Sequence, residues 1–98
     1  MPADGPLATP TVRIDNADVR VTEWRFTPGA RTGAHRHEHP YVVVPLTTGR
    51  LEARASDGTR TLADLVTGLP YYRPAGVEHD VVNANPHDFA FIEIELKR

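Results

Sequence analysis

The stretch GLPYYRPAGVEHDVVN, from Gly68 to Asn83, decides the fold of this 98-residue chain. Pro74 fixes the backbone φ angle at a turn, and Gly76 tolerates backbone angles that residues with a Cβ atom rarely adopt. The segments before and after this turn each fit a short strand. Because side chains alternate along a strand, His79 and Asn83 share one face of the second strand. The stretch therefore predicts two strands joined by a turn, with a histidine near the start of the second.

Outside this stretch, the apolar residues also recur mostly with a period of two, and turn residues break the chain at short intervals. We predict strands over residues 19–26, 41–46, 51–56, 59–65, 69–73, 79–83 and 89–96. The Asp57-Gly58 pair between two of them is the signal for a tight hairpin. No helix is compelling, so the chain is predicted to be all-β, a sandwich or barrel of short antiparallel strands.

The composition is that of one ordinary globular domain, with 40% hydrophobic and 24% charged residues. We assign residues 1–10 to a flexible N-terminal arm and residues 11–98 to the domain. The net charge of -2 shows none of the excess of basic residues that binding to nucleic acid or to an anionic membrane requires. The absence of cysteine excludes thiolate chemistry, and the only lysine, Lys97, is badly placed for a Schiff base. The N-terminal segment lacks the features of a signal peptide or a membrane span, so we expect a cytoplasmic protein.

A cluster of histidines lies in the segment HRHEHPY. His35, His37, His39 and Tyr41 share one parity, so in an extended segment they point to one face of the sheet. Neutral imidazole is a good ligand for first-row divalent metals, and two histidines at i and i+2 on a strand can reach one ion. The same pattern can belong to a solvated loop, so more distant residues must decide between these interpretations.

The motifs around these histidines resemble those of the cupins. The second cupin motif reads G-x5-P-x-G-x2-H-x3-N, and this chain fills every fixed position of it with Gly68, Pro74, Gly76, His79 and Asn83. The resemblance implies a double-stranded β-helix, or jelly-roll, barrel of short antiparallel strands.

The first cupin motif reads G-x5-H-x-H-x3,4-E-x6-G, and its opening glycine is followed at the stated spacing by His35 and His37. Its glutamate is missing, because Tyr41 and Val42 occupy the two alternative positions. In the family, three histidines and this glutamate bind a divalent transition metal. The resemblance therefore implies that His35, His37 and His79 hold one such ion, with iron, manganese, nickel and zinc as the candidates.

Several residues near the missing carboxylate have other interpretations. A Tyr41 phenol is a poor ligand for a divalent ion unless deprotonated, so we interpret it as a hydroxyl that caps the pocket and as a candidate proton or hydrogen-bond donor. His39 precedes a proline and is interpreted as a surface histidine. Glu38 and Glu78 point away from the ligands by strand alternation, and His87 is expected to be exposed in a turn.

The candidate substrate-binding residues are Trp24, Tyr72 and Arg73. Arg73 could pair with a substrate carboxylate through its planar guanidinium group. Which face of residues 19–26 looks inward depends on a register that the sequence does not fix. The same ambiguity covers residues 89–96, where the safer core assignment is the all-apolar set: Ile92, Ile94 and Leu96.

Three functions remain open at this stage. The first is a metal-dependent enzyme, a dioxygenase, isomerase or lyase, that acts on a small carboxylate or amino-acid-derived metabolite. The second is a non-catalytic binding or sensor module, and the third is a barrel that has lost its metal. The segments HRH, YVVVPLT and RPAGVEH resemble small bacterial cupins linked to β-alanine degradation, which implies amine or amino-acid catabolism.

The oligomeric state follows from the size of the barrel. A barrel this small exposes edge strands, whose unpaired backbone groups invite aggregation. Pairing these edges or the N-terminal arm with a second subunit would hide them. The family resemblance also implies dimers, so we expect a homodimer.

Overall fold

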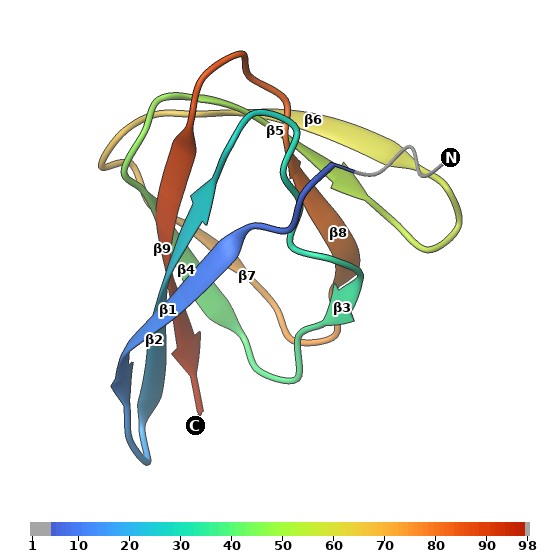
Figure 1. Cartoon of the computed structure of the whole chain (residues 1–98). Coiled ribbons are helices and arrows are strands. Elements are labelled where there is room, and N and C mark those ends of the chain that lie inside the picture. The colour runs from blue at the N-terminus through green and yellow to red at the C-terminus, as the bar shows by residue number, and fades with distance from the viewer. Residues whose placement is uncertain (1–4, 98) are drawn as a thin grey trace.

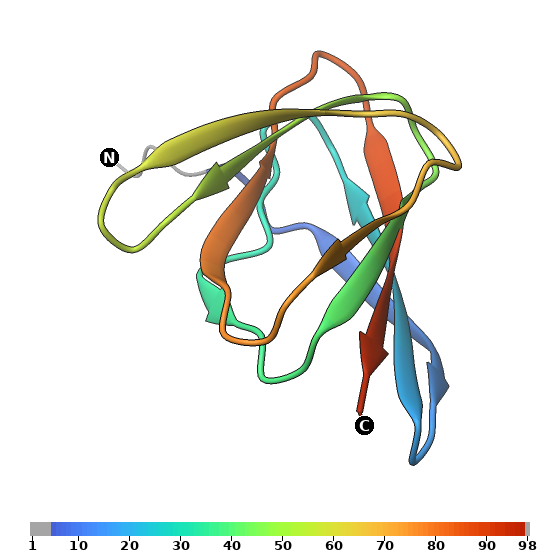
Figure 2. The same cartoon turned by 180° about the vertical axis from the view of Figure 1, so that it is seen from behind.

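The computed structural model describes residues 5–97 as two facing antiparallel sheets (Figures 1 and 2). The strands are β1 (Thr9–Asp15), β2 (Val19–Phe26), β3 (His35–Arg36), β4 (Tyr41–Pro45), β5 (Gly49–Arg54), β6 (Arg60–Leu65), β7 (Tyr71–Arg73), β8 (Glu78–Asn83) and β9 (Phe89–Leu96). One sheet has the order β1-β2-β9-β4-β7 and the other β3-β8-β5-β6. In residues 5–97 no helix is long and apolar enough to cross a membrane. The all-β fold class predicted from the sequence is confirmed.

The Asp57-Gly58 hairpin joins β5 to β6, as its sequence predicts. Gly58 has a φ of +90°, a left-handed value that glycine adopts without steric cost. The amide of Ala55 donates a hydrogen bond of 2.8 Å to the carbonyl of Thr59 across the turn. This hairpin forms the outer part of the four-stranded sheet.

The space between the sheets changes from apolar to polar along β2 and β9. These two strands pair with Phe26 opposite Phe89 at one end and Arg20 opposite Glu95 near the other. Phe26 and Phe89 are each 1% exposed. The apolar end therefore closes the barrel, and the opposite end is left for polar side chains.

The inward face of β9 is the opposite of the one predicted. Phe89, Phe91 and Glu93 are buried, whereas Ile92 and Ile94 are only half-buried on the outer face. The register explains this result, because Phe91 lies opposite Trp24 of β2 and packs against Phe26 with 5.5 Å between ring centroids. The aromatic residues fill the interior better than the branched aliphatic set, which lies against its strand neighbours on the outer surface.

The N-terminal segment contributes a strand that the sequence pattern did not predict. Of the proposed arm, residues 1–4 lie outside the described residues. Leu7 forms a parallel bridge with Arg31, and Ala8 donates a backbone hydrogen bond to the Arg31 carbonyl. Thr9 and Pro10 pair with β2. Within residues 5–97, residues 6–10 are thus already hydrogen-bonded or paired with the barrel, and the open edge of β2 gives Thr9 and Pro10 backbone partners.

Candidate metal centre

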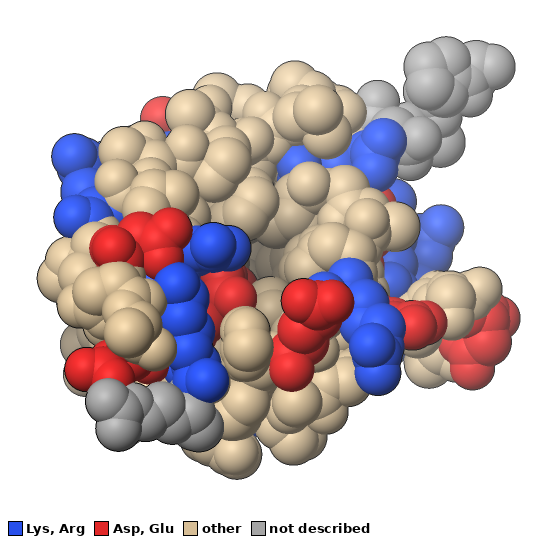
Figure 3. Space-filling model, turned by 90° about the horizontal axis from the view of Figure 1, so that it is seen from below, with Lys and Arg blue, Asp and Glu red and all other residues tan. Residues whose placement is uncertain are grey.

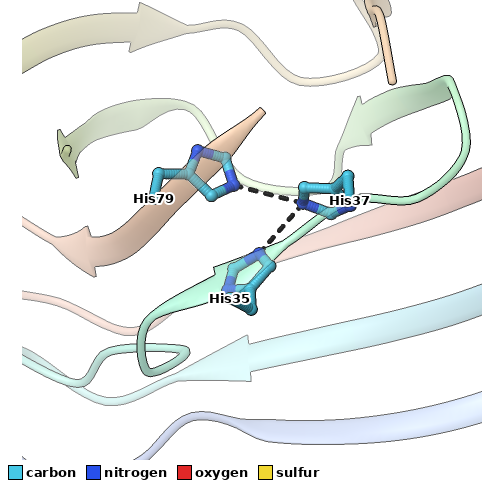
Figure 4. Close-up of side chains that lie close together, drawn as sticks. All are labelled: His35, His37 and His79. Atoms are coloured by element: carbon cyan, nitrogen blue, oxygen red, sulfur yellow. Dashed lines mark hydrogen bonds between the residues drawn. The ribbon is translucent and has the colours of Figure 1, made fainter. Parts of the chain in front are cut away.

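Three histidines from two segments of the chain meet at the polar end of the barrel (Figure 4). His35 in β3 lies directly opposite His79 in β8 in the antiparallel ladder, so their side chains project from the same face. His37 follows β3, and its backbone is fixed by two hydrogen bonds, from its amide to the Val77 carbonyl and from the Gly76 amide to its carbonyl. The turn that precedes β8 therefore positions His37 as well as His79.

The three side chains converge through the same ring nitrogen. The Nε2 atom of His37 lies 2.9 Å from Nε2 of His35 and 3.1 Å from Nε2 of His79. Nitrogen ligands about 2.0–2.1 Å from one ion lie about 2.8–3.4 Å apart as neighbours in octahedral or tetrahedral sites. The two distances to His37 match this spacing, and all three ligand atoms lie within 4.8 Å of one another, so the cluster could hold one divalent metal ion.

The orientation of His35 is set by its other ring nitrogen. Nδ1 lies 2.8 Å from the carbonyl oxygen of Gly33, which can only accept, so Nδ1 carries the proton and donates. The Nε2 lone pair of His35 is then free to bind a metal, an arrangement common among metal-binding histidines.

Asp80 holds the loop that carries His35. Its side chain points to the opposite face of β8 from His79, where it accepts hydrogen bonds of 3.0 Å from the Gly33 amide and 3.0 Å from the Arg31 guanidinium. Gly33 itself has a φ of +90°. The carboxylate thus fixes the position of the Gly33 carbonyl, which in turn fixes the tautomer of His35.

Burial keeps two of the imidazoles neutral. It lowers the pKa of His37 to about 4, with smaller contributions from the neighbouring His35 and His79. It likewise lowers the pKa of His79 to about 4, and His35 and Arg73 add to the effect. Because only a neutral imidazole binds a metal, these two side chains keep their lone pairs over the whole physiological pH range.

Glu93 is a site residue that the sequence pattern did not single out. Its side chain enters the same space from β9 and is 10% exposed, with 3.9 Å between its Oε2 atom and Nε2 of His37. Burial is the main cause that raises its pKa to about 7, and the nearby Glu95 raises it further. The signal available in the sequence was its parity with Phe89 and Phe91, which places it on the inward face.

Tyr41 packs against the cluster through its ring. It is 2% exposed, and its ring stacks on His37 with 3.9 Å between centroids and 24° between planes. Burial raises the pKa of its phenol well above the ordinary value, so the hydroxyl stays protonated. Tyr41 does not line the cavity in front of the histidines. Its candidate role as a proton donor remains a prediction.

A cavity of about 480 Å³ opens in front of His35 and His37, and His79 lines a second cavity together with His35. The first cavity is lined by side chains of both charge signs together with one indole: Arg20, Trp24, Thr32, His35, Arg36, His37, Glu38, His39, Glu93, Glu95 and Lys97. Figure 3, which views the molecule from the lower side of Figure 1, shows a hollow with basic and acidic side chains around it. The centre is therefore accessible to a small polar molecule.

Of the three candidate substrate-binding residues, Trp24 lines this cavity. Tyr72 and Arg73 do not. Tyr72 is 57% exposed, and the Arg73 guanidinium lies 4.7 Å from the ring centroid of Tyr71. Arg20 and Lys97, which line the cavity, are the cations better placed to meet a ligand that enters it.

The remaining acidic and histidine side chains lie at the surface or the rim. Glu78 is exposed and pairs with Arg36 at 3.6 Å, as strand alternation predicts. His87 is exposed. Glu38 and His39 line the cavity, and His39 is half-buried there, which is less exposed than the surface position expected for it.

Solved structures of known proteins share this fold. A cupin domain from Bordetella pertussis is 53% identical, with a TM-score of 0.91, and the match covers 95% of this chain and 96% of that one. A double-stranded β-helix protein from Klebsiella pneumoniae is 22% identical, with a TM-score of 0.76 and coverage of 99% and 82%. No protein-family model matches the chain. On its fold and its identity to the Bordetella domain, the chain belongs to the cupin family.

A curated relative narrows the comparison further. The β-alanine degradation protein BauB of Pseudomonas aeruginosa is 59% identical over 92 residues, which cover 94% of this chain and 96% of the relative. The chain is therefore similar to BauB over nearly its whole length.

Proposed function

We propose that this protein binds one divalent transition metal through His35, His37 and His79 and acts on a small carboxylate or amino-acid-derived metabolite. The observation that carries the proposal is the convergence of three Nε2 atoms, with those of His35 and His79 at 2.9 Å and 3.1 Å from that of His37, beside an open cavity that His35 and His37 line. The similarity to BauB supports a role in the degradation of β-alanine or a related amine. Iron, manganese, nickel and zinc suit a site of neutral imidazoles.

The residues of the cavity have separable roles in this proposal. The three histidines hold the ion, and the Gly33 carbonyl keeps the His35 tautomer that exposes its lone pair. A bound metal would polarise a substrate oxygen or activate a small molecule such as water or dioxygen. Arg20 and Lys97 offer positive charge for a substrate carboxylate, and Trp24 offers an apolar wall.

Metal content is the direct test. Protein purified without added metal should contain about one equivalent of a transition metal per chain by elemental mass spectrometry, or take it up after purification, since the ligands are preformed. His79→Ala should lose this metal, whereas His87→Ala, which removes an exposed histidine away from the cavity, should retain it. Absence of metal uptake by the folded wild-type protein would refute the proposal.

Turnover needs a separate measurement because a binding or sensor protein could use the same cavity. β-Alanine, related amino acids and small carboxylic acids should be incubated with the metal-loaded protein, with and without dioxygen. Product formation that His79→Ala abolishes supports an enzyme. Saturable binding without product would favour the sensor.

A further inference from the structure

Glu93 has the burial of a core residue and the chemistry of a metal ligand. It lies in β9, opposite Thr22 of β2 and Val43 of β4. Its side chain is 10% exposed. An ionised carboxylate at such a position loses most of its hydration, so it stays ionised only where a cation or several hydrogen-bond donors offset this cost, and otherwise takes up a proton. The groups that face Glu93 therefore decide its role.

Few groups among the described residues could stabilise an ionised Glu93 carboxylate. Its one neighbour at ion-pair distance is His37, a neutral side chain, 3.9 Å away. The indole Nε1 of Trp24 lies near enough to lower the Glu93 pKa in part, yet it forms no hydrogen bond of ordinary geometry and is itself buried without a partner. A buried carboxylate, without a lysine or arginine partner among residues 5–97, thus faces the imidazole lone pairs that a cation would bind.

We propose that Glu93 is the fourth protein ligand of the ion held by His35, His37 and His79, so that the centre has three imidazole nitrogens and one carboxylate oxygen. This inference rests on the proposed metal binding and adds the identity of the anionic ligand. The carboxylate comes from β9, the strand hydrogen-bonded to β4 on the side of the barrel opposite β3 and β8. The two sheets would then be linked through the metal.

To join this ligand set, the Glu93 side chain would have to move toward the histidines. Adjacent ligand atoms of one ion are about 2.8–3.4 Å apart, so the 3.9 Å between Glu93 and His37 is too long by about 0.5–1.1 Å, and the ligand atoms that lie within 4.8 Å of one another are those of the three histidines and not that of Glu93. The torsions of a glutamate side chain can rotate between staggered positions, and the last one is broad, so this movement does not require β9 to shift. A carboxylate ligand also reduces the net charge of a bound dication by one unit, which favours retention of the ion in a buried site.

The test is a titration of metal-free protein with Co²⁺, followed by its visible absorption and by competition with a chelator of known affinity. Glu93→Gln is nearly isosteric but lacks the charge, and Glu23→Gln is the matched control, a glutamate on the neighbouring strand β2 that does not line the cavity. We expect Glu93→Gln to weaken Co²⁺ binding by at least about tenfold, which is the usual scale for losing a group that supports a metal site, and to change the absorption bands. Glu23→Gln should keep both the wild-type affinity and the wild-type spectrum.

The outcomes separate this inference from the proposed function. If Glu93→Gln binds Co²⁺ with wild-type affinity and spectrum, Glu93 is not a ligand, while the three-histidine site stands. If the folded wild-type protein binds no Co²⁺ and no other transition metal, both proposals fail. Should Glu93→Gln not fold, Glu93→Asp keeps the charge on a shorter side chain, and an unchanged spectrum in that variant would equally overturn the inference.

Discussion

Asn83 should be one of the largest single contributors to the stability of this barrel. It is 2% exposed and lies at the end of β8, where the chain crosses between the sheets. Its amide group donates hydrogen bonds of 3.1 Å to the Thr27 carbonyl and 2.8 Å to the His87 carbonyl. Its side-chain oxygen accepts bonds of 3.0 Å and 2.7 Å from the backbone and side chain of Asn85. Asn83 therefore ties the end of β2 to the loop before β9.

Asn83→Ala removes these bonds; the Thr27 carbonyl keeps the Ala30 amide as a donor, whereas the His87 carbonyl loses the Asn83 amide. At about 1 kcal/mol for each hydrogen bond, the free energy of unfolding should fall by about 3–5 kcal/mol. For a domain of this size, that loss corresponds to a decrease in Tm of about 15–30 °C. The loss should be independent of metal, because the side chain does not line the cavity.

Urea denaturation and differential scanning calorimetry of the metal-free protein measure this effect. Asn16→Ala is the matched control, because Asn16 also accepts two hydrogen bonds, from the amides of Asp18 and Val19, but is exposed in the turn between β1 and β2. It should cost less than about 1 kcal/mol, since water replaces the lost partners. If Asn83→Ala cost no more than Asn16→Ala, the structural role assigned to Asn83 would be wrong.

Three other predictions follow from the structure. Between pH 6.5 and 4.5, His37 and His79 are protonated in the unfolded chain but neutral in the folded chain, so unfolding takes up two protons at these residues. Glu93 is protonated in the folded chain but ionised in the unfolded chain, so unfolding releases one proton there. The free energy of unfolding of the metal-free protein, measured by urea titration, should thus fall by about 1 kcal/mol for each pH unit of acidification. Glu93→Gln should roughly double this slope, because the proton released by Glu93 is then lost. A free energy of unfolding that does not change with pH would contradict the prediction. Gly76→Ala should cost about 1–2 kcal/mol in the same assay, because Gly76 has a φ of +95°, and a change under about 0.5 kcal/mol would refute this. The two sheets have four edge strands, namely β1, β7, β3 and β6, and we expect a homodimer in which some of these edges are covered. Sedimentation velocity measures the mass in solution, and the mass of a single chain would contradict this prediction.

The grouping of the three histidines in the candidate metal centre was predictable because it depends on local spacing. Two histidines at i and i+2 leave an extended segment from the same face, whatever the rest of the chain does. The Pro74–Gly76 turn likewise sets where β8 begins and hence the face on which His79 lies. The motif that joins Gly68 to Asn83 then identified the barrel in which these faces meet.

The orientation of side chains on long strands was less predictable. For β9, alternation alone allowed either the face with Phe89, Phe91 and Glu93 or the face with Ile92, Ile94 and Leu96 to point inward. The second face is entirely apolar and was therefore predicted to be the core, but the first face is the buried one. The interior of this barrel is not uniformly apolar, because it holds aromatic residues at one end and a polar site at the other. A rule that assigns the most apolar face to the core fails for such a strand.

The all-β class, the positions of the turns and the three histidines of the candidate centre were readable from the sequence, because these depend on a backbone period of two residues and on the conformational limits of glycine and proline. The remaining features of the site come from contacts between strands. The registers of β9 against β2 and β4 bring Glu93 close to His37, and Tyr41, at one of the two sequence positions of the missing glutamate, stacks its ring on His37. Those contacts join segments far apart in the chain, and their geometry depends on hydrogen-bond registers that no local pattern specifies.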